Sequence, residues 1–295
     1  MEQAEPHTLA SIARDLRALG LSEGDTLLLH GSQRSLGFVV GGTQTVVQAI
    51  LDVLGRTGTC VVPTQTSDNT EPSAWLRPPV PREWWPVIRE STPGFDPART
   101  PSRWMGVIAE AVRTWPGAVR SNHPQCSFAA LGYRANEIVA EHRLDDALGE
   151  SSPLGAIYRL GGKVMLLGCG YNSNTSLHLA EYRQKQPPLA TTGASILGPD
   201  GLSHWVSWSD VVTSDKDFEQ LGRALRNPME RSSDMWAMRE PVSWSNRRWL
   251  TSRRPGWPPG VVRPRPESSL NPCLPPSEWR DRTPRRRPAP KEQES

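Results

Sequence analysis

Apolar residues in the first third of the chain recur at spacings that alternate between the helical and the strand period. Between Thr8, a suitable helix cap, and Gly20 they follow helical spacing, at Leu9, Ile12, Leu16 and Leu19. Two short apolar runs, 26-TLLLH-30 and 58-GTCVVPT-64, predict strands. An amphipathic pattern between them predicts a second helix, at Val46, Val47, Ile50, Leu51 and Leu54. The predicted order is strand, helix, strand.

The same alternation returns later in the chain, after a long interruption. Residues 68–101 are rich in Pro and Trp with little periodicity, so we interpret them as a long ordered insertion with a functional role. Helices are predicted again near Trp104 and near Ala135. The run 162-GKVMLLG-168 predicts a buried strand, and 175-TSLHLAEYR-183 predicts the start of a helix. Alternating strands and helices indicate an α/β fold.

The pattern fails beyond about Leu221, which divides the chain into a domain at 1–222 and a tail at 223–295. The tail holds 13 of the 29 prolines and five tryptophans, and has no apolar stripe that a strand or helix could bury. We therefore expect a disordered, basic tail. Two origins stay open: a natural low-complexity extension, or a shifted reading frame in GC-rich coding DNA.

Charge separates the same two parts of the chain. The net charge of the chain is +3, but residues 223–295 carry 16 basic and 8 acidic residues, so residues 1–222 carry a net charge of −5. An acidic body argues against a nucleic-acid-binding face and is compatible with a cationic substrate. No apolar run approaches the roughly 20 residues that span a bilayer, and the N-terminus lacks the pattern of a signal peptide. We expect a cytoplasmic protein with no membrane partner.

Neither disulfides nor a metal site are expected from the cysteines, which show no CxxC pairing and no zinc-ligand spacing: Cys60, Cys126, Cys169 and Cys273. The segment 31-GSQRSLGFVVGG-42 lies between a strand end and a helix start, where backbone amides could hold a phosphate or pyrophosphate. It matches neither the P-loop nor the GxGxxG pattern. A tight turn without a ligand remains the alternative.

His178 and Glu181 are the most specific chemical signal in the chain. They are three residues apart, so on a helix both project from one face. The preceding Asn172, Ser173 and Asn174 are residues that commonly cap the start of a helix, but capping does not require His178. A structural histidine is the alternative, and a zinc site is disfavoured because HxxE lacks the second histidine of HExxH.

Several blocks in sequence order closely resemble the aminoglycoside 3-N-acetyltransferase family, over about Leu9 to Leu221. The blocks include LLLHGS, SLGFVVGGTQTVVQAILDVLG, GTCVVPTQ, TPSRWMG, RSNHPQCSFAALG and GGKVMLLGCGYNSNTSLHLAEYR. The resemblance implies a three-layer α/β fold with a mixed sheet, unrelated to the GNAT acetyltransferases. It also implies acetyl transfer from acetyl-coenzyme A to the 3-amino group of 2-deoxystreptamine aminoglycoside antibiotics, giving resistance.

The resemblance also assigns roles to individual residues. His178 would be the general base, Glu181 would fix its tautomer, and Thr175 would donate to the oxyanion. The expected coenzyme-binding residues are Ser32, Ser35, Gly37, Gly41, Gly42 and Arg120. The expected substrate-binding residues are Asp68, Glu71, Asp96 and His123, with Glu83 as a further carboxylate of the insertion and His123 as a competing candidate for the base.

The sequence departs from the family pattern at three places. Gly31, Tyr171 and Asn172 stand where a serine, a histidine and an aspartate are usual, and the tail lacks the usual terminal helix. A catalytically impaired, ligand-binding protein of the same fold, an interaction module that uses the basic tail, and acetylation of a different amine are therefore alternatives. The oligomeric state stays open, with a homodimer as one candidate.

Overall fold

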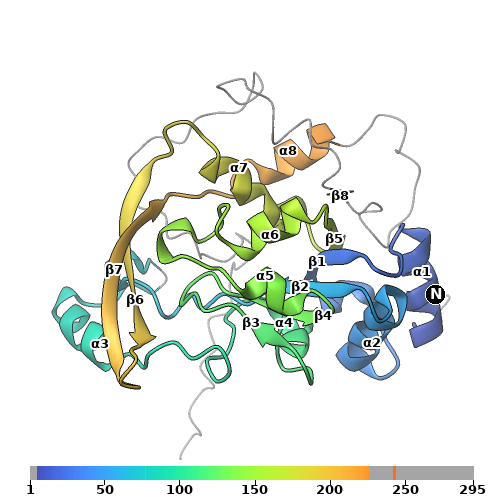
Figure 1. The fold of residues 1–295 in the computed structure, drawn as a ribbon, viewed down its shortest axis with the longest axis horizontal. Helices are drawn as coiled ribbons and strands as arrows, with labels where there is room; N and C mark the ends of the chain where they lie inside the picture. The colour runs from blue at the N-terminus through green and yellow to red at the C-terminus, as the bar shows by residue number, and fades with distance from the viewer. Residues whose placement is uncertain (1–4, 77, 226–241, 244–295) are drawn as a thin grey trace, which may run out of the picture.

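The computed structural model describes residues 5–76, 78–225 and 242–243. A mixed sheet lies at its centre, with helices on both faces (Figure 1). The sheet order is β3-β4-β2-β1-β5-β8, formed by β1 (Thr26–Gly31), β2 (Thr59–Pro63), β3 (Val119–Arg120), β4 (Phe128–Gly132), β5 (Lys163–Leu167) and β8 (Val242–Ser243). β1 runs parallel to both β2 and β5, while β4 is antiparallel to β2 and β8 is antiparallel to β5. The result is a three-layer α/β fold.

One face of the sheet is covered by α1 (Leu9–Ala18), α2 (Gly42–Leu54) and α4 (Gly106–Arg113). These helices bury their apolar stripes against Leu27 and Leu29 of β1 and their neighbours on β2 and β5. The predicted cap of α1 is confirmed as a capping box, in which the Ser11 amide donates to Thr8 Oγ1 at 3.2 Å and the Thr8 amide donates to Ser11 Oγ at 2.9 Å.

The other face is covered by α5 (Ala135–Val139), α6 (Pro153–Arg159) and α7 (His178–Tyr182). Leu28 alternates with Leu27 and Leu29, so it points to this face and packs in one cluster with Leu179 of α7. Successive side chains of β1 pack against different helix layers, so both faces of the strand are buried and its sequence is an unbroken apolar run.

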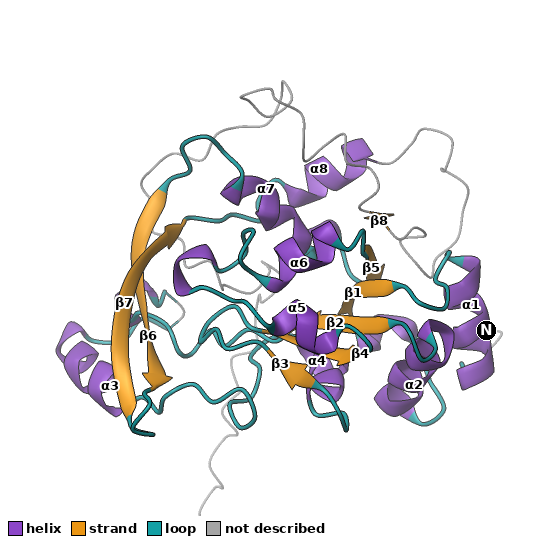
Figure 2. Ribbon diagram, viewed as in Figure 1, coloured by secondary structure: helices purple, strands orange, loops and turns teal. Residues whose placement is uncertain are grey.

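A long hairpin, β6 (Leu189–Leu197) and β7 (Ser203–Val211), stands away from α1 and α2 at the other end of the molecule (Figure 2). The insertion runs beside it through α3 (Trp85–Ser91) and three-residue 3₁₀ turns at Pro72–Ala74 and Arg82–Trp84. The prediction that the insertion is structured is confirmed for residues 68–76 and 78–101. The hairpin, β4 and α6 were not predicted, because short or half-exposed elements leave no clear apolar period.

The last described helix, α8 (Phe218–Leu225), passes the predicted boundary at 222, with Phe218 buried. Val242 and Ser243 pair with Val164 and Lys163 of β5, so this part of the predicted tail is a strand. The rest of the predicted tail, 226–241 and 244–295, lies outside the described residues. Within the described ranges no helix is both long and apolar enough to cross a membrane.

Candidate active site

The candidate site lies where β1 and β5 end side by side. His30 and Gly31 pair with Leu166 and Leu167, so the connections after both strands leave from one edge of the sheet. The connection after β1 leads to α2 on one face, and the connection after β5 leads to α7 on the other. Such a divergence of two neighbouring parallel strands is the usual place for a ligand crevice in α/β sheets.

The two connections are in contact. The Ser32 amide donates to the Leu167 carbonyl oxygen at 2.9 Å, and a Cβ added to Gly168 would lie 2.7 Å from Ser35 Cβ. Ser35 Oγ donates to Ser32 Oγ at 3.0 Å, within the 3₁₀ turn Gln33–Leu36. The loop therefore has one defined shape against β5, and the structure brings together Ser32 and Ser35, two of the residues expected to bind the coenzyme.

Glycines give the second half of this loop its shape. Gly37, Gly41 and Gly42 all have positive φ, at 74°, 77° and 61°. A Cβ at Gly41 would collide with Thr45 Oγ1, whereas a Cβ at Gly42 would meet no atom within 4 Å. Open space beside the first residue of α2 is what close approach of a coenzyme phosphate requires.

His178 and Glu181 form a buried hydrogen-bonded pair. His178 Nδ1 donates to Glu181 Oε2 at 2.7 Å, and the second oxygen, Oε1, accepts from the Ser214 amide at 3.0 Å. The side chains of His178 and Glu181 are 11% and 7% exposed. With Nδ1 committed to the carboxylate, Nε2 of the neutral ring carries the lone pair, which is the arrangement that a general base needs.

The chain before His178 is shaped by Asn174. Its side-chain oxygen accepts from the Ser176 amide at 3.2 Å and from Ser176 Oγ at 2.6 Å, which starts the 3₁₀ turn Thr175–Leu177. Thr175 is buried in this turn, three residues before His178. The predicted helix start is thus a 3₁₀ turn followed by the five-residue α7. The Tyr182 hydroxyl holds α7 to β7 by donating to Asp210 Oδ2 at 2.9 Å.

Two residues that were not singled out from the sequence are within electrostatic reach of His178. His30, at the end of β1, is fully buried with no partner for its Nε2 among the described residues, and burial together with charge on His178 lowers its pKa to about 3. Burial raises the pKa of Asp215, while charge on His178 acts in the opposite direction. An unpaired buried nitrogen costs about 1–3 kcal/mol, so His30 calls for an explanation beyond packing. The sequence signal that could have pointed to His30 was the polar HGS that ends the apolar segment LLLHGS.

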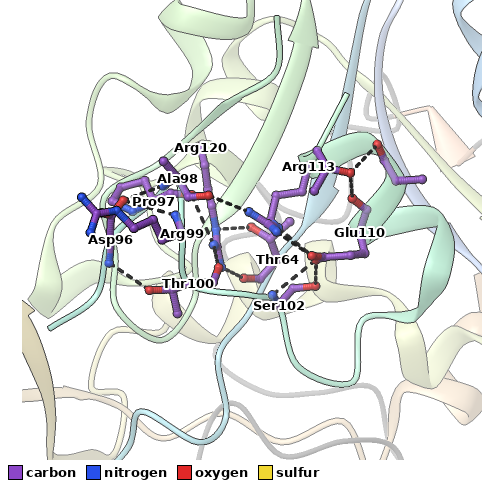
Figure 3. A network of polar contacts seen from close by, with 12 residues as sticks. Thr64, Asp96, Pro97, Ala98, Arg99, Thr100, Ser102, Glu110, Arg113 and Arg120 are labelled. Carbon is purple, nitrogen blue, oxygen red and sulfur yellow. Dashed lines mark hydrogen bonds and ion pairs between the residues drawn. The ribbon is translucent and has the colours of Figure 1, made fainter. Parts of the chain in front are cut away.

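The Arg120 guanidinium is bound by other parts of the protein. Each of its three guanidinium nitrogens donates within the protein: Nε to Thr64 Oγ1 and Ser127 Oγ at 3.0 Å, Nη2 to the Thr64 carbonyl, and Nη1 to the carbonyls of Pro97 and Thr100 (Figure 3). Burial first, and then the nearby Arg113, lower its pKa to about 10. This geometry argues against the predicted contact with a coenzyme phosphate. Arg120 instead fastens the insertion to the sheet.

His123 is likewise fully engaged inside the protein. Its Nδ1 accepts from the amides of Gln125 and Cys126 at 3.1 and 3.0 Å, and its Nε2 lies 3.4 Å from the Leu144 carbonyl oxygen. The ring stacks at 4.6 Å on His142, and burial lowers the pKa of His123 to about 4. These contacts favour a structural role over the predicted substrate contact or a competing base.

The carboxylates of the insertion divide into two that are held by several contacts and two that are exposed. Glu71 forms an ion pair with Arg89 and accepts from the Ser73 amide; burial opposes its ionisation, but these contacts outweigh it and lower its pKa. Asp96 accepts from the amides of Ala98 and Arg99. Asp68 is 61% exposed and lies 3.9 Å from Arg103, and Glu83 is exposed. Among the four, Asp68 and Glu83 are the carboxylates left open to a cationic ligand.

Among the described residues, no three His, Cys, Asp or Glu side chains gather as metal ligands would. Cys60 and Cys126 are buried and Cys169 is partly buried, and none of the three forms a disulfide with another described residue.

Comparison with known proteins identifies the fold and its chemistry. The family model described as aminoglycoside 3-N-acetyltransferase matches residues 28–238. The chain belongs to this family. Its members use acetyl-coenzyme A, so the chain is an acetyl-coenzyme A-dependent acyltransferase with the non-GNAT fold of the family.

Individual relatives agree with the assignment. YokD of Bacillus subtilis (strain 168), an SPbeta prophage-derived aminoglycoside N(3')-acetyltransferase-like protein, is 43% identical over 221 residues, which is 75% of this chain and 81% of YokD. The crystal structure of YokD superposes with a TM-score of 0.72 over 74% of this chain and 87% of that one. The binary complex of AAC-IIIb with CoASH, 32% identical, gives 0.67 over 75% and 84%.

Micromonospora chalcea supplies a further relative, aminoglycoside N(3)-acetyltransferase IX. It is 37% identical over 219 residues, 72% of this chain and 76% of that protein.

The departures of this acetyltransferase from the usual family pattern have local packing partners. A Cβ at Gly31 would lie 2.9 Å from Ile108 Cδ1, so a serine there would need the end of the Ile108 side chain on α4 to move. Tyr171 is buried with its ring against the backbone of Gly222, and the Asn172 amide donates to Glu219 Oε1 at 3.3 Å. Both contacts tie the turn before His178 to α8.

Proposed function

We propose that this chain transfers the acetyl group of acetyl-coenzyme A to the 3-amino group of a 2-deoxystreptamine aminoglycoside and so confers resistance. The observation that carries the proposal is the buried pair of His178 and Glu181 at the edge where the glycine-rich loop also lies. An aminoglycoside amine is protonated near pH 7, and only the neutral nitrogen attacks a thioester. A positioned base is therefore required.

In this mechanism the amine releases its ammonium proton to solvent before it attacks, and Nε2 of His178 takes a second proton from the nitrogen as it attacks the thioester carbon. The resulting imidazolium donates through Nδ1 to Glu181, which stays ionised and stabilises the charge. Thr175 lies three residues earlier and is proposed to donate to the reacting groups. The imidazolium then returns the proton to the departing thiolate of coenzyme A.

Recognition of the two substrates falls to different parts of the site. The loop with Ser32, Ser35, Gly37, Gly41 and Gly42 is proposed to hold acetyl-coenzyme A. Asp215, half-buried within electrostatic reach of His178, is proposed to attract the ammonium groups of the aminoglycoside. Asp68, which remains open to solvent, supplies a second carboxylate for the same polycation.

Thiol release from acetyl-coenzyme A, measured with a panel of aminoglycosides, tests the proposal. We expect release with 2-deoxystreptamine antibiotics and none with the same antibiotics already acetylated at the 3-amino group, which serve as matched controls. NMR of the product locates the new amide, and expression in a susceptible bacterium should raise the inhibitory concentration. No thiol release with any amine would favour the non-catalytic alternative, and acetylation at another nitrogen would replace the proposed substrate position.

A further inference from the structure

The segment 103–106 lies on the same edge of the sheet as the candidate site. β1 runs parallel to both β2 and β5, so the three strands end at one edge. The Arg103 amide donates at 2.7 Å to the carbonyl oxygen of Gln65, which lies just beyond the end of β2. A Cβ at Gly106 would lie 3.5 Å from the carbonyl oxygen of Gly31, the last residue of β1. The segment is therefore seated across the ends of β1 and β2.

Trp104, within this segment, combines a strained backbone with an exposed ring. Its φ is 65°, and among the residues that the structure describes no other residue except glycine has a positive φ. A bulky side chain rarely adopts this conformation, whereas glycine adopts it freely, and strained residues of this kind gather at functional sites. Trp104 is nevertheless 45% exposed, so packing alone does not account for an indole at this position. Contact with a ligand would account for it.

A cation lies over this indole, with a carboxylate beside it. The guanidinium carbon of Arg103 is 4.6 Å from the centroid of the Trp104 ring, which is within the range of a cation–π contact. Arg103 Nε lies 3.9 Å from Asp68 Oδ2, too far for a hydrogen bond. The side chains of Arg103 and Asp68 are 51% and 61% exposed, so solvent screens their attraction. Arg103 is thus held loosely, in a place whose chemistry suits a positive charge.

We propose that Trp104 and Asp68 bind one ammonium group of the aminoglycoside, which takes the place of the Arg103 guanidinium. The inference rests on the proposed function, and it makes Trp104 and Arg103 specificity-determining residues. An alkylammonium ion can make the same two contacts as the guanidinium, one with the indole face and one with the carboxylate. Only β1 separates β2 from β5, a span of about 10 Å at the usual strand spacing. The bound ammonium therefore belongs to a ring other than the one that reacts near His178.

Removing Arg103 should strengthen aminoglycoside binding, which a merely structural arginine would not do. The probe is neamine, a two-ring 2-deoxystreptamine aminoglycoside, titrated by calorimetry into the protein with coenzyme A present. Arg103→Met removes the competing cation and should lower the Kd of neamine by roughly 2- to 30-fold, the range for one cation–π contact. Arg99→Met is the matched control, because it removes an arginine from the insertion that is 88% exposed and pairs with Asp96. Its smaller effect measures the change in overall charge.

Substitutions at Trp104 and Asp68 test the two contacts of the ammonium group. Trp104→Asn removes the ring with a residue that tolerates positive φ, and Trp104→Phe keeps an aromatic face. Trp104→Asn and Asp68→Asn should raise the Kd of neamine, Trp104→Phe should raise it less, and the Kd of coenzyme A should stay unchanged in all three.

The competition between the two cations gives the sharpest test. In the Trp104→Asn background, Arg103→Met should strengthen neamine binding less than it does in the unsubstituted protein, because the contested site has lost one of its two contacts. Equal effects of Arg103→Met and Arg99→Met, or additive effects of Arg103→Met and Trp104→Asn, would overturn the inference. An effect of Trp104→Asn on coenzyme A alone would assign the indole to the coenzyme and overturn it as well.

An NMR measurement keeps this inference apart from the proposed function. The indole N–H resonance of Trp104, assigned in ¹⁵N-tryptophan-labelled protein by its loss in Trp104→Phe, should move when neamine binds, and should move less in Asp68→Asn. If it moves so but the protein acetylates no aminoglycoside, the ammonium site stands and the proposed reaction fails. If the protein acetylates aminoglycosides and neither the resonance nor the Kd depends on Asp68 and Arg103, the reaction stands and the inference fails. If neamine does not bind, both are wrong.

Discussion

Glu181 Oε2 accepts a hydrogen bond from His178 Nδ1 at 2.7 Å, and both side chains are almost fully buried. The other oxygen of Glu181 accepts from the Ser214 amide, so the carboxylate is fixed from a second segment of the chain. The orientation of the histidine therefore depends on contacts that lie far apart in the sequence.

Replacing His178 or Glu181 should lower kcat, and the loss should be larger for His178. His178→Ala removes the base and should lower kcat by roughly 10²- to 10⁴-fold, with little change in the dissociation constant of coenzyme A. Glu181→Gln keeps the shape but loses the charge that stabilises the imidazolium, so kcat should fall less and its pH profile should shift. Steady-state kinetics with both substrates varied provides the measurement. Near-normal turnover of His178→Ala would remove this residue from the mechanism.

Gly42 and Gly161 form a matched pair for testing the coenzyme loop. Both have positive φ, at 61° and 66°, and a Cβ at either would meet no atom within 4 Å, but Gly161 lies at the other end of β5. Each Gly→Ala change should cost about 1–2 kcal/mol of stability through the left-handed backbone. Gly42→Ala alone should also raise the KM for acetyl-coenzyme A. Equal KM values in the two variants would argue against coenzyme contact at Gly42.

Arg120→Met should damage the fold and spare coenzyme binding. It removes the donor to the half-buried Thr100 carbonyl and one of the two donors to the Thr64 carbonyl, which keeps the Ser127 hydroxyl, and this should cost about 1–3 kcal/mol. Arg99→Met, at a side chain 88% exposed, is the control for the loss of a nearby positive charge. Urea unfolding and the affinity for coenzyme A are the two measurements. A stable Arg120→Met protein with weakened coenzyme binding would restore the phosphate contact expected from the sequence.

Buried histidines should make the protein sensitive to acid. Burial lowers the pKa of His123 to about 4 from the usual 6.5, so between these pH values the unfolded chain binds a proton that the folded chain does not. Stability should be fully present above pH 6.5 and fall as the pH drops towards 4, by about 1.4 kcal/mol per pH unit for one such proton. His30 and His142 act in the same direction.

Asp210 opposes this trend, because burial raises its pKa to about 6 and its contribution is largest below pH 3.8. His123→Asn keeps an acceptor for the amides of Gln125 and Cys126 and removes the titration. Its free energy of unfolding, measured from pH 4.5 to 7.5, should depend on pH with a slope smaller by about one proton. An unchanged slope would mean that His123 does not remain neutral in the folded protein.

Local patterns were enough to predict the elements that frame the site. The cap at Thr8, the apolar runs of β1 and β5 and the helical stripe of α2 each depend on neighbouring residues, and all are confirmed. The spacing of His178 and Glu181 also belongs to this class, because residues three apart share a helix face whatever packs around them. The sequence blocks shared with the aminoglycoside 3-N-acetyltransferases were enough to predict the family.

Contacts between distant segments were decided by the tertiary structure alone. The sequence predicted Arg120 and His123 as ligand-binding residues. In the structure they hydrogen-bond to distant turns, at Thr100 and Leu144, so their polar atoms are not available to a ligand. The sequence predicted His30 as the end of an apolar strand, yet the fold buries its Nε2 without a hydrogen-bond partner among the described residues. Whether a polar side chain is satisfied depends on which segments meet around it, and residue spacing along one segment carries no record of that meeting.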